Sequence, residues 1–430
     1  MRLVALVLFL TQIAFAAEQE PEHSTIMNSV AESYVKLVLA VGRHDKDYVD
    51  AYFGPPEWRK EAEKTLIPLA QIQSDASQLL PRLQKADVSE TDEMTRLRKE
   101  FLRKQIESLI ARVEILAGKR MSFDEESEAL YDAVAPSFSD DHFKSVSKNL
   151  ESLLPGEGSL TDRYDDFRKG FVIPKEKLDA VFKAAIEECR NRTRRHIQLP
   201  QEESFEIEYV TGESWGAYNW YKGNSHSLIQ INTDLPIYID QPLGLASHEG
   251  YPGHHVYNVL LEKELLRKRN WIEFSVYPLF SPESLIAEGS ADFGIEVLFS
   301  ERERESFERN ALFPLAGIPG KDAERYFRIR NLVKQLRYAG LEACRRYLDG
   351  RMTKEQTIAW LQENALSPQK HAEKRLRFFE QYRSYIINYS YGEDLVSRYI
   401  ESRGGTAENP QQRWIEFERL LASPRLPSGL

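Results

Sequence analysis

Apolar residues recur at helical spacing over most of the chain. From Ser24 to about Glu202 they follow one another at steps of three and four positions, which places them on one face of a helix. The charged segment from Glu90 to Lys119 has the same periodicity, so we predict one long amphipathic helix there with a solvated polar face. Proline- and glycine-containing breaks divide this region at residues 54–56, 80–81, 136 and 155–156.

Two short segments that follow have a different pattern. Apolar and polar residues alternate over 205–210 and again over 227–232, with Gly, Trp, Asn and Tyr between them. Strict alternation is typical of half-buried β-strands. We therefore predict a small antiparallel sheet or hairpin here. Its strand at 227–232 is a candidate edge on which an extended peptide could pair.

Helical periodicity resumes near Leu243 and continues to the end of the chain. Its breaks fall at residues 278–282, 314–320, 350, 368 and 404–405. The fold is therefore predicted to be mainly α, a body of many helices. The one small antiparallel β-hairpin or sheet would lie directly before the segment in which three histidines are close together.

The first sixteen residues have the pattern of a secretory signal peptide. Arg2 precedes an apolar run from Leu3 to Ala16, and small residues stand at the positions that a signal peptidase reads. The alternative, an N-terminal membrane anchor, would need about 20 apolar residues. We expect cleavage near Ala16, export to the periplasm or the medium, and a mature chain without a membrane span.

Charge and cysteine content exclude some classes of function. The net charge is −10 and the pI is near 5.6, which argues against nucleic acid as a partner because such binding needs a basic patch. Cys189 and Cys344 are the two cysteines, too few for a thiolate zinc site. They could form a disulfide in an oxidising compartment or remain as two buried free thiols.

Three of the nine histidines lie within residues 248–255, where the sequence reads HEGYPGHH. Neutral imidazole is the commonest metal ligand, and the glutamate beside His248 is placed to act as a general base. In the usual zinc-peptidase motif the two histidines are four positions apart, which puts both on one face of a regular helix. The pattern here therefore predicts a zinc site with Glu249 as the base, but on an irregular helix.

The second histidine ligand is either His254 or His255. On an ideal helix His255 would lie within about 20° of His248 but about 10.5 Å further along the axis, and His254 would point elsewhere. Pro252 and Gly253 predict a bulge or kink that absorbs the extra residues. We favour His254, because Gly253 lets the backbone relax just before it. The other histidine is then expected to support the ligands or contact substrate.

A third ligand is predicted on the helix that would begin near residue 281. Glu288 stands there between small residues, which would let two helices pack closely around its carboxylate. Asp292, one turn later, could hold the second nitrogen of a ligating imidazole. Without the upstream histidines these acids would be interpreted as an ordinary acidic helix face. With them, Glu288 is the predicted ligand and Glu283 its alternative.

These residues resemble the hallmark of a bacterial family, the proteins that carry domain of unknown function 885: HExxPGHH followed by an EG-small-A element. The two elements read HEGYPGHH at 248–255 and EGSA at 288–291, and similarity extends over about residues 158–400. The resemblance implies a helical, zincin-like metallopeptidase body, distantly similar to carboxypeptidase Taq, in which His, His and Glu bind Zn2+. Two other family elements differ: DxGxH is absent, and PGQAxxYxxG survives as Tyr389 and Gly392. The parts of this chain that contact substrate are therefore expected to differ from those of other family members.

We thus predict one helical catalytic unit over residues 17–430, with an N-terminal helical part (17–157) and a part that holds the metal site (158–430). Its predicted function is a secreted zinc-dependent hydrolase, a metallopeptidase that acts as an exopeptidase on short peptides. Zinc-activated water would attack the peptide, with Glu249 as general base. Tyr389, or Tyr218 behind it, is the candidate donor to the developing oxyanion.

Other substrates and roles fit the same motif. A terminal carboxylate would need an arginine, for which one predicted helix offers Arg325, Arg328, Arg330 and Arg337. The enzyme could instead hydrolyse non-peptide amides or esters with the same residues. The chain could also be a non-catalytic metal-binding scaffold protein of the cell envelope. Glu249 argues against that role, because a structural zinc site needs no base and fills its fourth position with protein.

Overall fold

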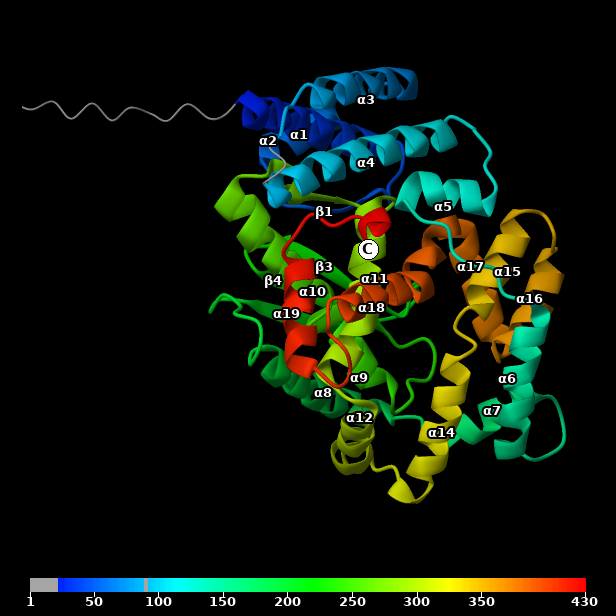
Figure 1. Ribbon diagram of the computed structural model, residues 1–430. Coiled ribbons are helices and arrows are strands. Elements are labelled where there is room, and N and C mark those ends of the chain that lie inside the picture. Colours follow the sequence, from blue (N-terminus) through cyan, green and yellow to red (C-terminus); the bar gives the residue numbers. More distant parts are fainter. Residues whose placement is uncertain (1–21, 89–91) are drawn as a thin grey trace, which may run out of the picture.

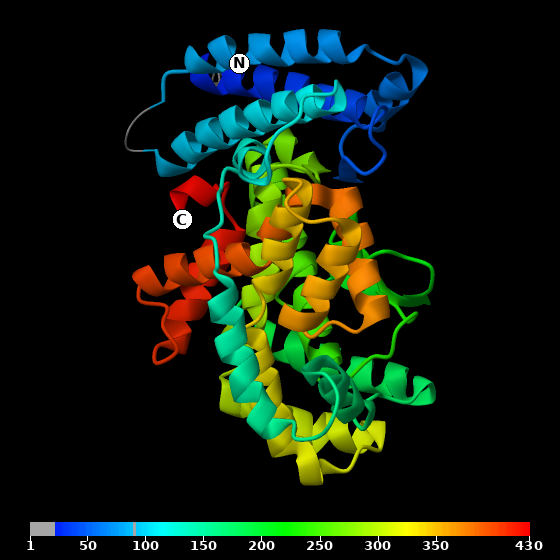
Figure 2. The same cartoon turned by 90° about the vertical axis from the view of Figure 1, so that its right-hand side faces the viewer.

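The computed structural model describes residues 22–88 and 92–430, so the predicted signal peptide at 1–16 lies outside it. Helices make up most of the described chain, which confirms the mainly α prediction. The N-terminal helices lie across one end of the molecule, and the other helices form a long body beneath this layer (Figures 1 and 2). Within the described ranges, no helix is both long and apolar enough to cross a bilayer.

The N-terminal layer is built on α1, against which α3 and α4 pack. α4 is the long helix predicted from the charged segment, and its first turn is capped by the Asp92 side chain, which accepts from the backbone N–H of Thr95. Elements in this half of the chain are α1 (Glu22–Val41), β1 (Val49–Tyr52), α2 (Pro56–Lys64), α3 (Leu69–Gln84), α4 (Glu93–Leu116), α5 (Phe123–Tyr131), α6 (Asp140–Leu153), α7 (Leu160–Lys169) and α8 (Leu178–Thr193).

Helices of the second half surround α11, which runs through the middle of the body (Figure 1). They are α9 (Gln241–Leu245), α10 (His254–Leu260), α11 (Pro282–Leu298), α12 (Glu301–Phe307), α13 (Phe313–Ala316), α14 (Ala323–Lys334), α15 (Ala339–Leu348), α16 (Lys354–Asn364), α17 (Gln369–Tyr382), α18 (Ser390–Ser402) and α19 (Pro410–Leu421). The short strand β5 (Val276–Pro278) precedes α11.

The predicted sheet is present but has a different topology. Its strands are β2 (Ser204–Val210), β3 (Ala217–Gly223) and β4 (His226–Asn232), in the order β2-β4-β3. β3 and β4 form an antiparallel hairpin, whereas β2 pairs with β4 in parallel. The prediction of a wholly antiparallel sheet is therefore wrong for β2. β4 is also the central strand, so residues 227–232 offer no free edge for a peptide.

Close packing in the centre depends on glycine. Almost every side chain of α11 is buried, and its main neighbour is α18. A Cβ on Gly289 would overlap the backbone of Gly392 in α18, so only glycine permits this approach. The predicted seam of small residues is therefore present, and it fixes Glu288 beside the contact between the two helices.

Strand pairing and a buried ion pair are among the interactions that join the N-terminal layer to the body. β1 pairs antiparallel with β5. Arg98 of α4 donates two hydrogen bonds, of 2.6 and 3.0 Å, to the carboxylate of Glu273, and both side chains are buried.

Cys189 and Cys344 lie in separate core clusters as buried free thiols, so the alternative of a disulfide is not realised.

Candidate metal centre

The helix that carries the first histidine is broken where the sequence predicts. α9 continues into a π-helical turn over Ala246–Gly250, residues 251–253 leave the helix, and α10 begins at His254. A Cβ on Gly253 would overlap the carbonyl oxygen of His248, so this return of the backbone requires glycine. The break brings the side chains of His248 and His254 together in space, whereas an unbroken helix would point them in different directions.

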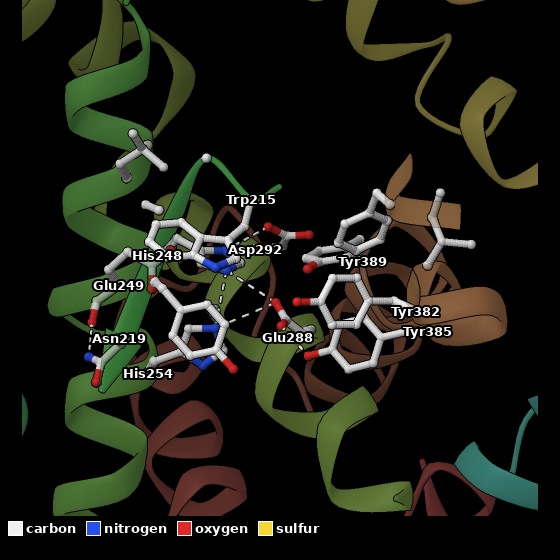
Figure 3. Close-up of a pocket in the computed structure, with 18 of the residues that line it drawn as sticks. Trp215, Asn219, His248, Glu249, His254, Glu288, Asp292, Tyr382, Tyr385 and Tyr389 are labelled. Carbon is white, nitrogen blue, oxygen red and sulfur yellow. Dashed lines mark hydrogen bonds and ion pairs between the residues drawn. The ribbon is translucent and has the colours of Figure 1, made fainter. Parts of the chain in front are cut away.

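Three ligand atoms converge at this break. His248 Nε2 lies 3.2 Å from His254 Nε2 and 3.1 Å from Glu288 Oε2, and His254 Nε2 lies 3.5 Å from the same oxygen. The group comes from the π-helical turn, α10 and α11, and Figure 3 shows Glu288 between the histidines and a row of tyrosines. The structure thus brings together the three residues expected to bind metal.

The protonation pattern of these groups fits a bound cation. Asp292 Oδ1 lies 2.8 Å from His248 Nδ1, so the Nδ1–H donates to this carboxylate and Nε2 is the ring nitrogen that faces the other two ligand atoms. Oε2 of Glu288 is buried and has no hydrogen-bond donor among the described residues. Ligands about 2.0–2.1 Å from zinc at tetrahedral angles would be about 3.3 Å apart, close to the three distances found. The residues present therefore fit Zn2+.

Glu288 stays ionised in this environment. Burial alone would raise the pKa of its carboxyl group, but His254 and His248 outweigh this and hold the pKa well below its usual range. Tyr385 donates a hydrogen bond of 2.6 Å to the other oxygen, Oε1. Tyr385 was not predicted, because it is distant in sequence and no motif marks it.

Glu249 is buried and lines the same cavity as the three ligand residues. Its backbone carbonyl accepts a hydrogen bond of 2.6 Å from the Asn219 side chain, which ties the π-helical turn to β3. Burial raises the pKa of the Glu249 carboxyl group, and the nearby His248 and His254 partly oppose this rise. The side chain is therefore close to the ligands without being one of them.

His255, the alternative ligand, does not reach the cluster. Its ring is fully buried, with Nδ1 2.8 Å from Ser227 Oγ and Nε2 3.1 Å from Glu203 Oε2. α10 turns consecutive residues to different sides, so His255 points toward the sheet while His254 points toward the cavity. Glu203 was not predicted, and it also accepts a hydrogen bond of 2.6 Å from Tyr251.

The two candidate donors differ in their partners. Tyr389 lines the cavity with its ring 6.5 Å from the ring of His248, and its hydroxyl has no hydrogen-bond partner among the described residues. Burial raises its pKa well above the ordinary value, so the phenol is protonated. Tyr218 also lines the cavity, but its hydroxyl donates to Asp50 of β1. Tyr389 is therefore the one with a hydroxyl available to a ligand.

A cavity of about 790 Å³ opens over the cluster. Its wall contains residues of β3, α9, α10, α11 and α17, together with the tyrosines at 385 and 389. Of the four predicted carboxylate-binding arginines, Arg337 reaches this wall. Arg325 instead donates to the backbone of Leu153, and Arg330 pairs with Glu308. The cavity has a size typical of sites for small organic ligands.

No protein-family model and no curated protein matches the sequence. Among solved structures, a protein described as a candidate lipoprotein from Colwellia psychrerythraea has a TM-score of 0.52 at 15% identity, over 86% of this chain and 70% of that one. A protein described as a candidate lipoprotein of unknown function from Shewanella oneidensis has a TM-score of 0.43 at 12% identity, over 85% of this chain and 76% of that one. The M32 carboxypeptidase from Deinococcus radiodurans R1 has a TM-score of 0.46 at 13% identity, over 91% and 88%. The first of these likenesses shows a shared fold, and none of them assigns an activity. Membership of the 885 family stays a prediction.

Proposed function

We propose that this chain is a zinc-dependent hydrolase, a metallopeptidase that acts on short peptides. The observation that carries the proposal is the position of Glu249. This buried carboxylate lines the cavity beside His248, His254 and Glu288 but does not belong to the group of possible ligands. A structural zinc site is closed by four protein ligands, whereas three ligands beside an open cavity and a carboxylate are typical of catalytic sites.

Glu249 is the proposed general base. When bound, a zinc ion would supply a Lewis acid that acidifies water and polarises a substrate carbonyl group. Glu249 accepts the proton of the attacking water and delivers it to the leaving amine. The rise of its pKa on burial makes this cycle easier, because a base works best when its pKa lies nearer the operating pH.

Tyr389 is the proposed donor to the developing oxyanion. Tyr389 lines the cavity with its ring 6.5 Å from the ring of His248, and its protonated hydroxyl has no hydrogen-bond partner among the described residues. A donor that is already positioned stabilises charge in the transition state without reorganising water. Tyr218 is proposed to hold Asp50 instead, because its hydroxyl already donates to that carboxyl group.

Short peptides are the proposed substrates, because a cavity of about 790 Å³ holds a ligand of a few residues rather than a folded chain. Non-peptide amides and esters would use the same groups, and substrate profiling separates the two classes. Export to the periplasm or the medium is part of the proposal and rests on the pattern of residues 1–16.

Metal content and turnover test this function together. We expect about one zinc ion per chain in purified protein and hydrolysis of members of a mixed dipeptide and tripeptide library. His248→Ala should lose both metal and activity. Glu249→Gln should keep the metal and lose activity by at least about 100-fold, because the base contributes to catalysis and not to binding of the ion. A wild type that binds no metal and cleaves no library member would refute the proposal.

A further inference from the structure

One face of α17 presents basic side chains to the cavity. His371, Lys374 and Arg375 are separated by three and four positions, so they share a helix face, and all three line the cavity that contains the metal cluster. The aromatic residues Phe378 and Tyr382 continue this face toward the tyrosines beside Glu288. A ligand at the metal cluster could therefore extend along α17.

Arg375 has no acidic partner among the residues that the structure describes. Its guanidinium makes one hydrogen bond, from Nη1 to Ser367 Oγ at 3.4 Å. By contrast, Arg337 on the same cavity wall pairs with Asp394. Arginine remains charged in proteins, and Arg375 is partly buried, so the loss of water around a charge without a counter-ion is costly. Burial accordingly lowers the pKa of Arg375.

The neighbouring Lys374 is also without an ion pair within the described ranges. Its Nζ donates to the backbone carbonyl of Trp215 at 3.2 Å. Burial lowers the pKa of Lys374, and Asp234 and Glu213 are near enough to oppose this effect without forming an ion pair. Lys374 therefore adds positive potential beside Arg375 that is only partly neutralised.

The position of the Arg375 side chain is constrained by α15. A Cβ on Gly340 would overlap the guanidinium nitrogen Nη2, so the side chain lies directly against the α15 backbone. Because the side chain is confined in this way, less conformational entropy is lost when it binds a ligand. A confined guanidinium at the wall of a cavity, with no carboxylate partner in the described ranges, is well suited to bind a carboxylate.

We infer that Arg375, assisted by Lys374, binds the terminal carboxylate of the peptide whose hydrolysis is proposed above. This inference rests on the proposed function and adds its specificity: release of residues from the carboxyl end of short peptides. The terminal carboxylate is favoured over an acidic side chain because the cavity also contains the metal cluster. Both groups line one cavity of about 790 Å³, which holds a ligand of a few residues, so a peptide that reaches from the cluster to Arg375 is expected to end near Arg375.

Paired substrates test the inference on the zinc-loaded protein. Tripeptides with a free terminal carboxylate are compared with the same peptides as terminal amides, in the wild type, Arg375→Gln and the control Arg377→Gln. Arg377 is an exposed residue of the same helix that does not line the cavity. We expect kcat/KM of the wild type to favour the free acid by at least about tenfold, the value of a hydrogen bond to a charged group. Arg375→Gln should lose this preference and Arg377→Gln should keep it.

Binding measured by calorimetry separates this inference from the proposed function. N-acetylated dipeptides and their terminal amides are titrated into the same three proteins. A preference for the acid that disappears in Arg375→Gln supports the carboxylate site even if no peptide is hydrolysed. Hydrolysis without any preference for the acid would overturn the carboxylate site and leave the hydrolase intact. Retained cleavage of amides that end in glutamate, but not of other amides, would assign Arg375 to an acidic side chain and also overturn it.

Discussion

The predicted ligands are held in place by side chains that are not themselves ligands. Asp292 fixes the tautomer of His248, and Tyr385 donates to the oxygen of Glu288 that faces away from the histidines. Such partners orient a ligand before metal arrives and increase its basicity. The metal affinity of the site should therefore depend on residues that the ion does not contact.

Replacement of Asp292 by alanine should weaken zinc binding by about 10- to 100-fold, because His248 loses the acceptor that orients its ring. Affinity can be measured by competition with a chromophoric chelator of known zinc affinity. Glu296→Ala, one turn further along α11, is the matched control, since Glu296 pairs with Lys334 away from the cluster. Equal affinity of Asp292→Ala and the control would exclude this role for Asp292.

Local patterns reveal residues that are close in sequence, and distant partners escape them. His248, Glu249 and Glu288 stand out because two short motifs contain them, and the proline and glycine between the histidines indicate a break in the helix. Tyr385 and Glu203 approach the site only through the tertiary fold. The sequence pattern favours His254 over His255 but cannot decide between them, since the direction of a broken helix is set by its packing.

At the scale of elements, the break between the π-helical turn and α10 is held by Glu203. Its buried carboxylate accepts hydrogen bonds from Tyr251, which lies inside the break. It also accepts hydrogen bonds from Arg190 of α8 and from Arg194, which directly follows α8. It also lies 3.1 Å from the ring of His255, at the start of α10. One carboxylate thus ties together the sheet, the break and the end of α8.

Stability in acid should reveal this interaction. Burial alone would raise the pKa of Glu203, but hydrogen bonds from His255, Tyr251 and the two arginines lower it to about 2. A folded-state pKa below the unfolded value of about 4.3 contributes about 3 kcal/mol above pH 4.3, and this is lost as the pH falls toward 2. Between pH 6 and 3 the wild type should therefore lose about 1–2 kcal/mol more than Glu203→Gln in urea unfolding.

The exposed neighbour Glu202 provides the control for this measurement, since Glu202→Gln should follow the wild type at every pH. If Glu203→Gln had the same dependence on pH as the wild type, folding would not lower the pKa of Glu203, and the stabilising role of its hydrogen bonds would be refuted.

The sheet shows where prediction of an element succeeds and its pairing does not. Alternation correctly located strands at 205–210 and 227–232 but carries no information on the direction of a partner. The strand at 217–223 was hidden among aromatic and glycine residues. The tight turn at Asn224 and Ser225, both with positive φ, pairs β3 with β4, and β2 then adds to the other edge of β4.

At the scale of the whole molecule, the N-terminal layer takes part in the cavity. Asp50, in β1, lines the cavity wall and accepts the hydroxyl of Tyr218. Burial raises its pKa to about 6. The division of the chain at residues 157 and 158 follows a break in the sequence pattern, yet β1 joins β5 across that division. We therefore propose that both parts form one cooperative unit and that the metal cluster depends on the layer above it.

Replacement of Arg98, which forms a buried ion pair with Glu273, tests whether the layer and the body unfold as one unit. Arg98→Ala leaves Glu273 buried without a counter-ion, which should cost about 3–5 kcal/mol. If the layer and the body unfold together, tryptophan fluorescence and zinc release should shift to lower urea by the same amount. Arg103→Ala is the control on the same helix, because Arg103 is partly exposed and, among the described residues, its ion pairs are with its helical neighbours. Zinc release unchanged in Arg98→Ala, while the fluorescence transition shifts, would show instead that the metal cluster belongs to a body that is stable without the N-terminal layer.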